Sequence, residues 1–197
     1  MKRGGLRAEL AAAGLLALLV LWSVGAGAVT FGFDQRLSSL TFKVTAPFVT
    51  AVGLVREYSG TVEVEDARRF RNPRLDLTVN LKSLFTKHAE RDAKMMEVLE
   101  VEKFPTASLH IERIEGIPDA PAPGQPAEVT LRGTLSLHGA SKPIDIRASA
   151  TYDGATLIGR GSAQFLLSSF NIERPRVFLV SLRDEVEVFF TIRAVPR

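Results

Sequence analysis

The chain has 197 residues, enough for one domain with a core of ordinary size. It contains no cysteine, which excludes disulfides, thiolate metal sites, cysteine nucleophiles and a lipidated cysteine. The formal net charge of +3 is too small to indicate nucleic acid as a partner.

The N-terminal residues have the pattern of a secretory signal peptide. Three basic residues among the first seven precede an almost entirely apolar run over residues 10–24, and Ala26-Gly27-Ala28 supplies a small-residue cleavage site. We therefore expect residues 1–28 to be removed and residues 29–197 to form one exported domain. The competing interpretation is an uncleaved helix that anchors the protein in the inner membrane, because the apolar run nearly reaches the ~18 residues that indicate a spanning helix.

Alternation of apolar and polar residues predicts eight or nine strands. It runs through residues 31–34, 40–45, 61–65, 75–82, 109–111, 129–137, 144–151, 157–165 and 186–193. Each predicted strand has one apolar and one polar face, whereas the strands of a parallel sheet covered by helices are apolar on both faces. The polar outer faces also exclude an outer-membrane barrel. We expect an all-β antiparallel barrel or sandwich in water, with its apolar faces inward.

Three segments depart from this alternation. Residues 47–57 are ambiguous between a helical turn and a loop. Residues 117–128 contain four prolines and a glycine, which predicts an exposed loop. Apolar residues at helical spacing between Met95 and Leu99 predict one short helix near residues 89–100, covering an end or a flank of the sheet.

The polar run His88-Ala89-Glu90-Arg91-Asp92 precedes the predicted helix. An imidazole and two carboxylates could bind a metal, but the run lacks the second histidine of a zinc helix and carries Arg91 between the acids. We favour a structural role, in which Glu90, Arg91 and Asp92 form ion pairs and backbone hydrogen bonds at the helix start, where acids suit the helix dipole.

The remaining candidates for chemistry are weaker. We expect His110 and His138 to be surface residues, since neither has a partner at metal-ligand spacing. The sequence contains no Gly-x-Ser-x-Gly motif and no glycine-rich phosphate loop. We therefore expect no catalytic residues, no metal site and no cofactor.

Two neighbouring predicted strands carry small inward residues. These are Ala148, Ala150, Gly159, Gly161 and Ala163. They could leave a void along one wall, or let the helix or the opposite sheet pack closely. A barrel of about eight strands is either filled by side chains or holds one small ligand. An apolar cavity would bind a lipid tail, at ~0.8 kcal/mol per buried methylene, and Gly161→Leu would then reduce lipid uptake.

Four segments carry motifs that occur together in one family. Residues 79–92, VNLKSLFTKHAERD, are followed by Phe104-Pro105, and residues 133–143 read GTLSLHGASKP. Phe33-Asp34 and the sequence SFNI at residues 169–172 stand in the same order. Over residues 29–197 the chain resembles the YceI-like family of bacterial polyisoprenoid-binding proteins.

This resemblance implies an extended lipocalin-like, eight-stranded antiparallel β-barrel in the periplasm. Its apolar tunnel would hold a long isoprenoid chain, such as a quinone or a polyprenyl lipid. Family members often place a histidine after the second strand, where this chain has Thr45-Ala46-Pro47. Residues 47–58 are therefore expected to shape the tunnel mouth differently.

The inward phase of the predicted strands and the predicted helix supply the expected tunnel lining. It consists of Phe42, Val44, Leu77, Val79, Leu81, Met95, Leu99, Leu131, Leu135, Ala148, Gly161, Phe165, Val188 and Phe190. Met95 and Leu99 are expected to close one end.

The expected function is non-enzymatic carriage or sequestration of an isoprenoid lipid, with transient membrane contact for lipid exchange. The alternative is an envelope stress-related protein that acts through protein partners, with a filled core and no ligand. An enzyme acting on isoprenoids ranks third. The oligomeric state, including a homodimer, is left open.

Overall fold

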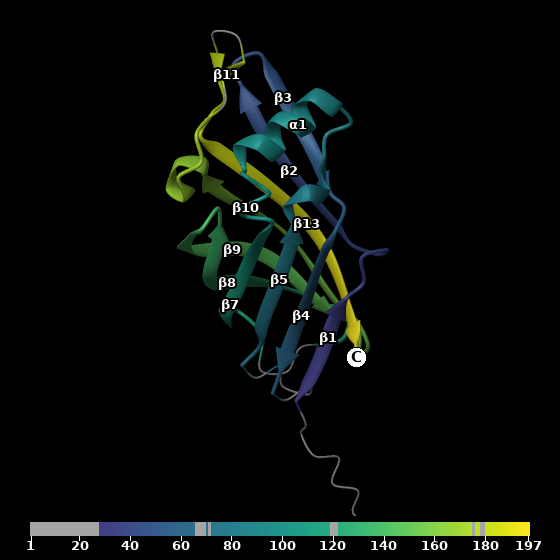
Figure 1. Cartoon of the computed structure of the whole chain (residues 1–197). Helices are drawn as coiled ribbons and strands as arrows, with labels where there is room; N and C mark the ends of the chain where they lie inside the picture. The colour runs from purple at the N-terminus through teal and green to yellow at the C-terminus, as the bar shows by residue number, and fades with distance from the viewer. Residues whose placement is uncertain (1–27, 66–69, 71, 119–121, 175, 178–179) are drawn as a thin grey trace, which may run out of the picture.

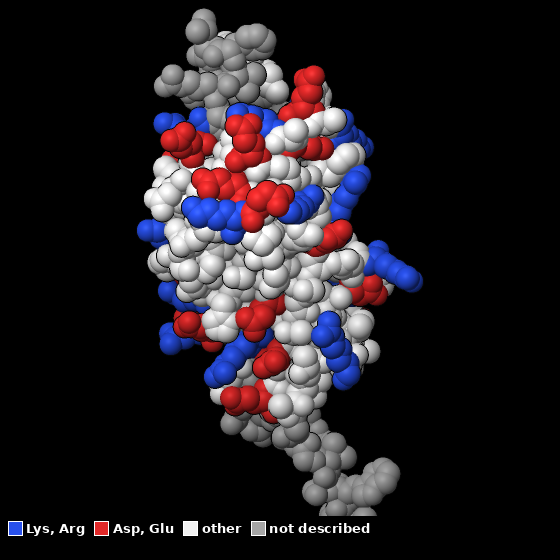
Figure 2. All heavy atoms as spheres, in the orientation of Figure 1, with Lys and Arg blue, Asp and Glu red and all other residues white. Residues whose placement is uncertain are grey.

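The computed structural model describes residues 28–65, 70, 72–118, 122–174, 176–177 and 180–197 (Figure 1). The predicted signal peptide lies, except for its last residue, outside the described residues. Among those residues, no helix is long and apolar enough to cross a membrane. Acidic and basic side chains are interspersed on the face shown in Figure 2, without a large area of one sign.

Eight antiparallel strands close into a barrel, which confirms the predicted fold. In order around the barrel they are β1 (Val29–Phe33), β4 (Tyr58–Val64), β5 (Arg74–Asn80), β7 (Thr106–Glu115), β8 (Pro126–Leu137), β9 (Ala140–Tyr152), β10 (Leu157–Leu166) and β13 (Glu185–Pro196). The pairing of β1 with β13 completes the closure, with Phe31 opposite Pro196. Because the barrel is closed, each of these eight strands has a paired strand on both sides.

Three shorter strands lengthen one end of the barrel, called here the upper end. They are β2 (Ser39–Ala46), β3 (Val49–Val55) and β6 (Leu84–Phe85). β2 pairs with the first half of β13, whereas β1 pairs with its last residues, so β1 and β2 follow one line along β13. β3 pairs with β2 and β6, in the same way that β4 pairs with β1 and β5. β1 with β2, β3 with β4, and β5 with β6 therefore each form one long strand that is interrupted once.

The segment that was ambiguous between a helical turn and a loop is a strand. β3 places Ala51 and Gly53 inward, whereas Val52 and Leu54 are exposed on the outer face. Small residues on the inner face and apolar residues on the outer face hide the alternation. The expectation of a helical turn or loop over residues 47–57 was therefore wrong for β3.

The single α-helix among the described residues, α1 (Ala89–Val98), lies at the upper end (Figure 1). His88 is its N-cap, and its Nδ1 accepts the backbone N–H of Arg91 at 3.4 Å. Asp92 Oδ1 accepts the backbone N–H of Thr86 at 2.9 Å and its hydroxyl at 2.6 Å. These bonds confirm the predicted backbone hydrogen bonding for Asp92, and they give His88 a capping role that was not predicted. Neither Glu90 nor Arg91 forms an ion pair with another described residue.

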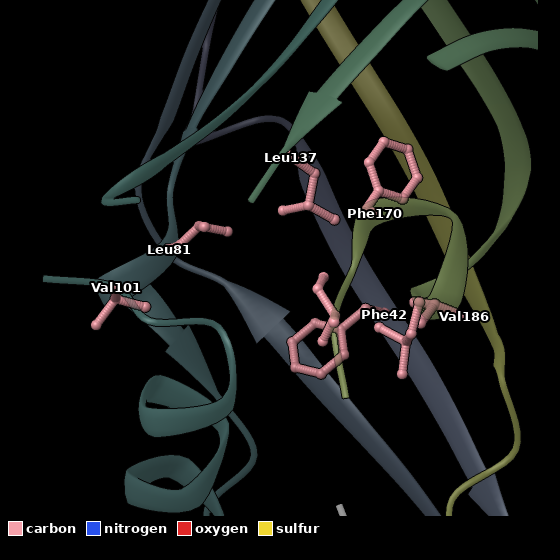
Figure 3. Packing of buried hydrophobic residues seen from close by; sticks show 8 residues of the cluster. Phe42, Leu81, Val101, Leu137, Phe170 and Val186 are labelled. Atoms are coloured by element: carbon pink, nitrogen blue, oxygen red, sulfur yellow. The ribbon is translucent and has the colours of Figure 1, made fainter. Parts of the chain in front are cut away.

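A cluster of buried hydrophobic residues lies in the upper half of the barrel (Figure 3). Its buried members, called here the upper cluster, are Phe42, Leu81, Val101, Leu137, Leu167, Phe170, Ile172 and Val186. Met95, Met96, Val98 and Leu99 from α1 and the turn after it pack against this cluster. The helix therefore seals the upper end by joining a solid core.

Of the two histidines predicted to lie on the surface, only His110 does so. Its Nδ1 lies 2.6 Å from Asp76 Oδ1 on the exposed face of the barrel. The prediction for His138 was wrong, because its side chain is only 9% exposed. The β8–β9 turn holds it in a left-handed conformation, with its ring centroid 4.6 Å from that of Phe104 and its Nδ1 3.1 Å from the Phe170 carbonyl oxygen.

An apolar chamber as the candidate functional site

The lower half of the barrel encloses a chamber of about 370 Å³. Every strand of the closed barrel except β1 and β4 contributes at least two residues, and Phe33 and Val62 come from those two. The side chains that line its inner part are Leu40, Leu75, Leu77, Leu109, Leu131, Ile146, Ala148, Ala163, Val188 and Phe190. No charged residue lines the chamber within the described part of the chain.

Small residues on β9 and β10 create much of this space. Ala148, Ala150, Gly159 and Ala163 all border the chamber. A Cβ added at Gly159 would have no atom within 4 Å, so this position opens directly onto empty volume. The void along one wall is therefore present at these four positions, and close packing of the helix against them is excluded because α1 lies at the other end.

Gly161 differs from Gly159, although both lie on β10. A Cβ at Gly161 would stand 2.6 Å from the carbonyl oxygen of Arg147 and 2.8 Å from Cζ of Phe190. The ring of Phe190 therefore covers this glycine, and Gly161 is not among the residues that line the chamber. Gly161→Leu would push against backbone, so it is a poor probe of the chamber.

The chamber reaches the lower end of the barrel, where loops and strand ends surround it. Ile117, Pro118 and Gln125 of the β7–β8 connection border this end, and Gly124 N–H donates to the Tyr152 carbonyl oxygen at 2.7 Å. The predicted exposed loop over 117–128 is shorter than expected, because β8 begins at Pro126. The loop thus supplies part of the chamber's apolar rim.

Aromatic rings close one side of this rim. The ring of Phe70 lies 4.8 Å from that of Tyr152, edge to face, and 6.4 Å from that of Phe31. The polar residues that line the chamber are Gln125, Thr151 and Tyr152, all at the rim. The hydroxyl of Tyr152 already donates to the Gly154 carbonyl oxygen at 2.7 Å. Polar recognition is therefore confined to the rim.

The side chain of Asp153 stabilises the turn between β9 and β10 at the lower end. Asp153 Oδ1 accepts the N–H groups of Ala155 at 3.0 Å and Thr156 at 2.7 Å. These bonds stabilise the carboxylate and hold the pKa of Asp153 below its usual value. The charge is thus used to order the turn and is fully exposed to solvent.

Five of the fourteen residues predicted to line a tunnel border the chamber, namely Leu77, Leu131, Ala148, Val188 and Phe190. Eight others belong to the upper cluster or pack against it, namely Phe42, Val44, Val79, Leu81, Met95, Leu99, Leu135 and Phe165. Gly161 is the fourteenth. The structure therefore divides the predicted lining between the chamber in the lower half and the upper cluster.

A second, smaller hollow of about 200 Å³ lies in the upper half, between β9 and β10. The two strands pair only from Arg147 to Tyr152, and they separate beyond that point. Leu135 and Phe165 line the hollow together with Phe170, Lys142 and Gln164. Two of the predicted lining residues thus face this hollow instead of the chamber.

Several chamber residues were not among the predicted lining. Leu75 and Leu109 stand in the inward phase of their strands, so alternation could have found them. Phe70, Ile117 and Pro118 lie in connections, where no periodicity indicates which side chains point inward. Among the described residues, no group of three or more histidine, aspartate or glutamate side chains could hold a metal ion.

Comparison with known proteins agrees with the barrel fold. The model of the YceI-like domain matches residues 31–194. The chain belongs to the YceI-like family. The UPF0312 protein of Pseudomonas aeruginosa is 29% identical over 154 residues, which cover 73% of this chain and 73% of that protein. A UPF0312 protein of Shewanella baltica is 26% identical over 170 residues, covering 81% and 85% of the two chains.

Solved YceI-like structures share the fold. A polyisoprenoid-binding domain from Saccharophagus degradans, implicated in plant cell wall breakdown, superposes with a TM-score of 0.68 at 17% identity. The match covers 85% of this chain and 98% of that domain. BcnA of Burkholderia cenocepacia superposes with a TM-score of 0.67 at 20% identity, covering 83% and 99% of the two chains. At these identities the likeness establishes the fold alone.

Proposed function

We propose that this YceI-like protein carries or sequesters an isoprenoid lipid, of the quinone or polyprenyl type, in the lower chamber. The observation that carries the proposal is a space of about 370 Å³ inside the barrel, open at the lower end, whose inner wall is lined by apolar side chains. Burying an apolar tail there removes it from water at a gain of ~0.8 kcal/mol per methylene. The similar domain from Saccharophagus degradans is a polyisoprenoid-binding domain, which supports the same class of ligand.

The distribution of polar groups favours binding over catalysis. The polar side chains that line the chamber are those of Gln125, Thr151 and Tyr152, and none of them forms a nucleophile–base pair. A head group would therefore stay at the rim while the tail enters. We accordingly assign no catalytic residue and no cofactor.

The proposal extends to where the protein works. The N-terminal sequence pattern supports export to the periplasm, with retention by an uncleaved membrane anchor as the alternative. Isoprenoid lipids reside in membranes, so loading and delivery would require transient contact with a membrane surface.

One observation favours the second candidate, a protein that acts through protein partners. The hairpin of β2 and β3 exposes a set of apolar side chains, with Phe48 90% exposed at its turn and Val49 and Val52 each 58% exposed. Clusters of exposed apolar residues often mark contact surfaces. The exposed residues lie at the upper end, and none of them borders the chamber, to which this hairpin contributes only Leu40 among the described residues.

Native mass spectrometry of the protein purified from an envelope fraction, followed by lipid extraction, separates the two candidates. Lipid carriage predicts an isoprenoid at about one per chain, and uptake of added quinone by protein stripped of lipid. A mass without ligand, together with no uptake of quinone, would favour the partner-binding candidate.

A further inference from the structure

On five strands the chamber ends against the upper cluster within two residues. On five strands, an inward residue that lines the chamber stands two positions from an inward residue of the upper cluster or packed against it. The pairs are Leu40 and Phe42, Leu77 and Val79, Leu109 and Ala107, Ala163 and Phe165, and Val188 and Val186. The upper members of these five pairs form the boundary of the chamber on their strands, called here the ceiling.

Phe42 is the largest side chain of this ceiling that comes from β2. It stands directly opposite Val188, which lines the chamber, and two residues above Leu40. On its other side, its ring lies over Gly53, where an added Cβ would be 2.2 Å from Cζ of Phe42. Phe42 is only 7% exposed and is not itself among the residues that line the chamber, so its ring lies in the barrel interior next to the lining residues Leu40 and Val188.

The space below this ceiling limits the size of a ligand tail. A cavity of ~150 Å³ binds one benzene, so a chamber of about 370 Å³ has room for about fifteen carbons. The wall from Val188 to Ala194 spans six steps along β13, or roughly 20 Å, which is about 15 Å along the barrel axis at the usual strand tilt. Both measures correspond to a tail of about three isoprene units.

We propose that the chamber selects isoprenoid tails by length, accommodating about fifteen carbons, and that Phe42 sets this limit. The inference rests on the proposed function and sharpens it, because a tunnel through the whole barrel would accept much longer chains. Carbons beyond the limit remain outside the rim in water and add little affinity.

A series of isoprenoid alcohols tests the limit in the full-length protein. Geraniol, farnesol and geranylgeraniol differ by single isoprene units, and competition native mass spectrometry gives their relative affinities. We expect farnesol to bind at least about ten-fold more tightly than geraniol, and geranylgeraniol to bind within about two-fold of farnesol. A further ten-fold gain for geranylgeraniol would overturn the length limit while leaving lipid binding intact. Binding of none of the three would overturn the proposed function as well.

Phe42→Ala tests which residue sets the limit. Removal of the ring opens the ceiling, so the affinity ratio of geranylgeraniol to farnesol should rise about ten-fold. Leu137→Ala is the matched control, because Leu137 is a buried member of the same cluster whose cross-strand partner, Ala140, does not line the chamber, whereas Val188, the partner of Phe42, does. An unchanged ratio in Phe42→Ala, or an equal rise in Leu137→Ala, would show that Phe42 is not the limit. If Phe42→Ala does not fold, Phe42→Leu should give a smaller rise, and its absence would count against the assignment in the same way.

Discussion

The ring of Phe42 lies over Gly53 on the adjacent strand, in the space that a side chain at position 53 would occupy. A Cβ there would stand 2.2 Å from Cζ and 2.5 Å from Cε1 of the ring. Because the ring is buried and belongs to the upper cluster, it cannot move aside without disturbing its neighbours.

Gly53→Ala should therefore destabilise the protein by about 1–3 kcal/mol through overpacking. Gly159→Ala is the matched control, since its Cβ would meet no atom within 4 Å, and it should be neutral or slightly stabilising. Urea unfolding of both variants measures the difference. Equal stability of the two would contradict the placement of the Phe42 ring.

Asp92 connects α1 to the segment before it through two hydrogen bonds from Thr86, at 2.9 and 2.6 Å. Asp92→Ala should cost about 1–3 kcal/mol, because it leaves the buried hydroxyl and N–H of Thr86 without their acceptor. Glu90→Ala, at an exposed position in the same helical turn, should change stability by less than about 0.5 kcal/mol. Farnesol binding should be unchanged in both variants, because α1 packs at the end of the barrel opposite the chamber rim. A loss of binding in folded Asp92→Ala protein would refute that separation.

Tyr58 is buried, and its hydroxyl has no hydrogen-bond partner among the described residues. Burial raises the pKa of this hydroxyl above its usual value. Tyr58→Phe should therefore leave the free energy of unfolding unchanged or raise it by up to about 1 kcal/mol. Tyr152→Phe, which removes a donor to the Gly154 carbonyl oxygen, should instead lower it by about 0.5–1.5 kcal/mol. The prediction fails if Tyr58→Phe is the more destabilising change in thermal unfolding.

Asp184 accepts the backbone N–H of Ser168 at 2.9 Å and also its hydroxyl. The hydroxyl and then the N–H of Ser168 hold the pKa of Asp184 below its ordinary value of 3.8. The carboxylate thus contributes stability that is present above pH 3.8 and is lost as the pH falls through the lower pKa of the folded state. Asp184→Asn should be less stable at neutral pH, and its stability should fall less steeply below pH 3.8. The measurement is the urea unfolding midpoint of each protein as a function of pH over this range. The prediction is wrong if the midpoints of Asp184→Asn and wild type change in parallel with pH. Glu128→Gln is the control, because it removes an exposed acid on β8.

Alternation in the sequence predicts which face of each strand points inward, but not the level at which the barrel is hollow. Phe42 and Phe190 both stand in the inward phase, yet Phe42 belongs to the filled half and Phe190 borders the chamber. That difference depends on the pairing register and on residues of neighbouring strands, such as Gly53 under Phe42. Periodicity within a single strand gives neither the pairing register nor the identity of the residues on neighbouring strands.

Two other outcomes have similar causes. β3 was missed because its inner residues are as small as Gly53, whereas its outer residues are apolar. The burial of His138 depends on Phe104 and Phe170, each more than thirty positions away in the sequence. The barrel and the short helix, by contrast, follow from local periodicity and from the family motifs, so these were predictable.

The most direct test of the chamber compares two leucine substitutions on the same strand. Gly159→Leu adds a side chain inside the chamber, where a Cβ has no neighbour within 4 Å, and Ser162→Leu adds the same side chain on the exposed outer face of β10. Farnesol affinity, measured by native mass spectrometry on both folded variants, should fall at least about ten-fold in Gly159→Leu and stay unchanged in Ser162→Leu. Equal, wild-type affinity in both variants would contradict lipid binding in the lower chamber.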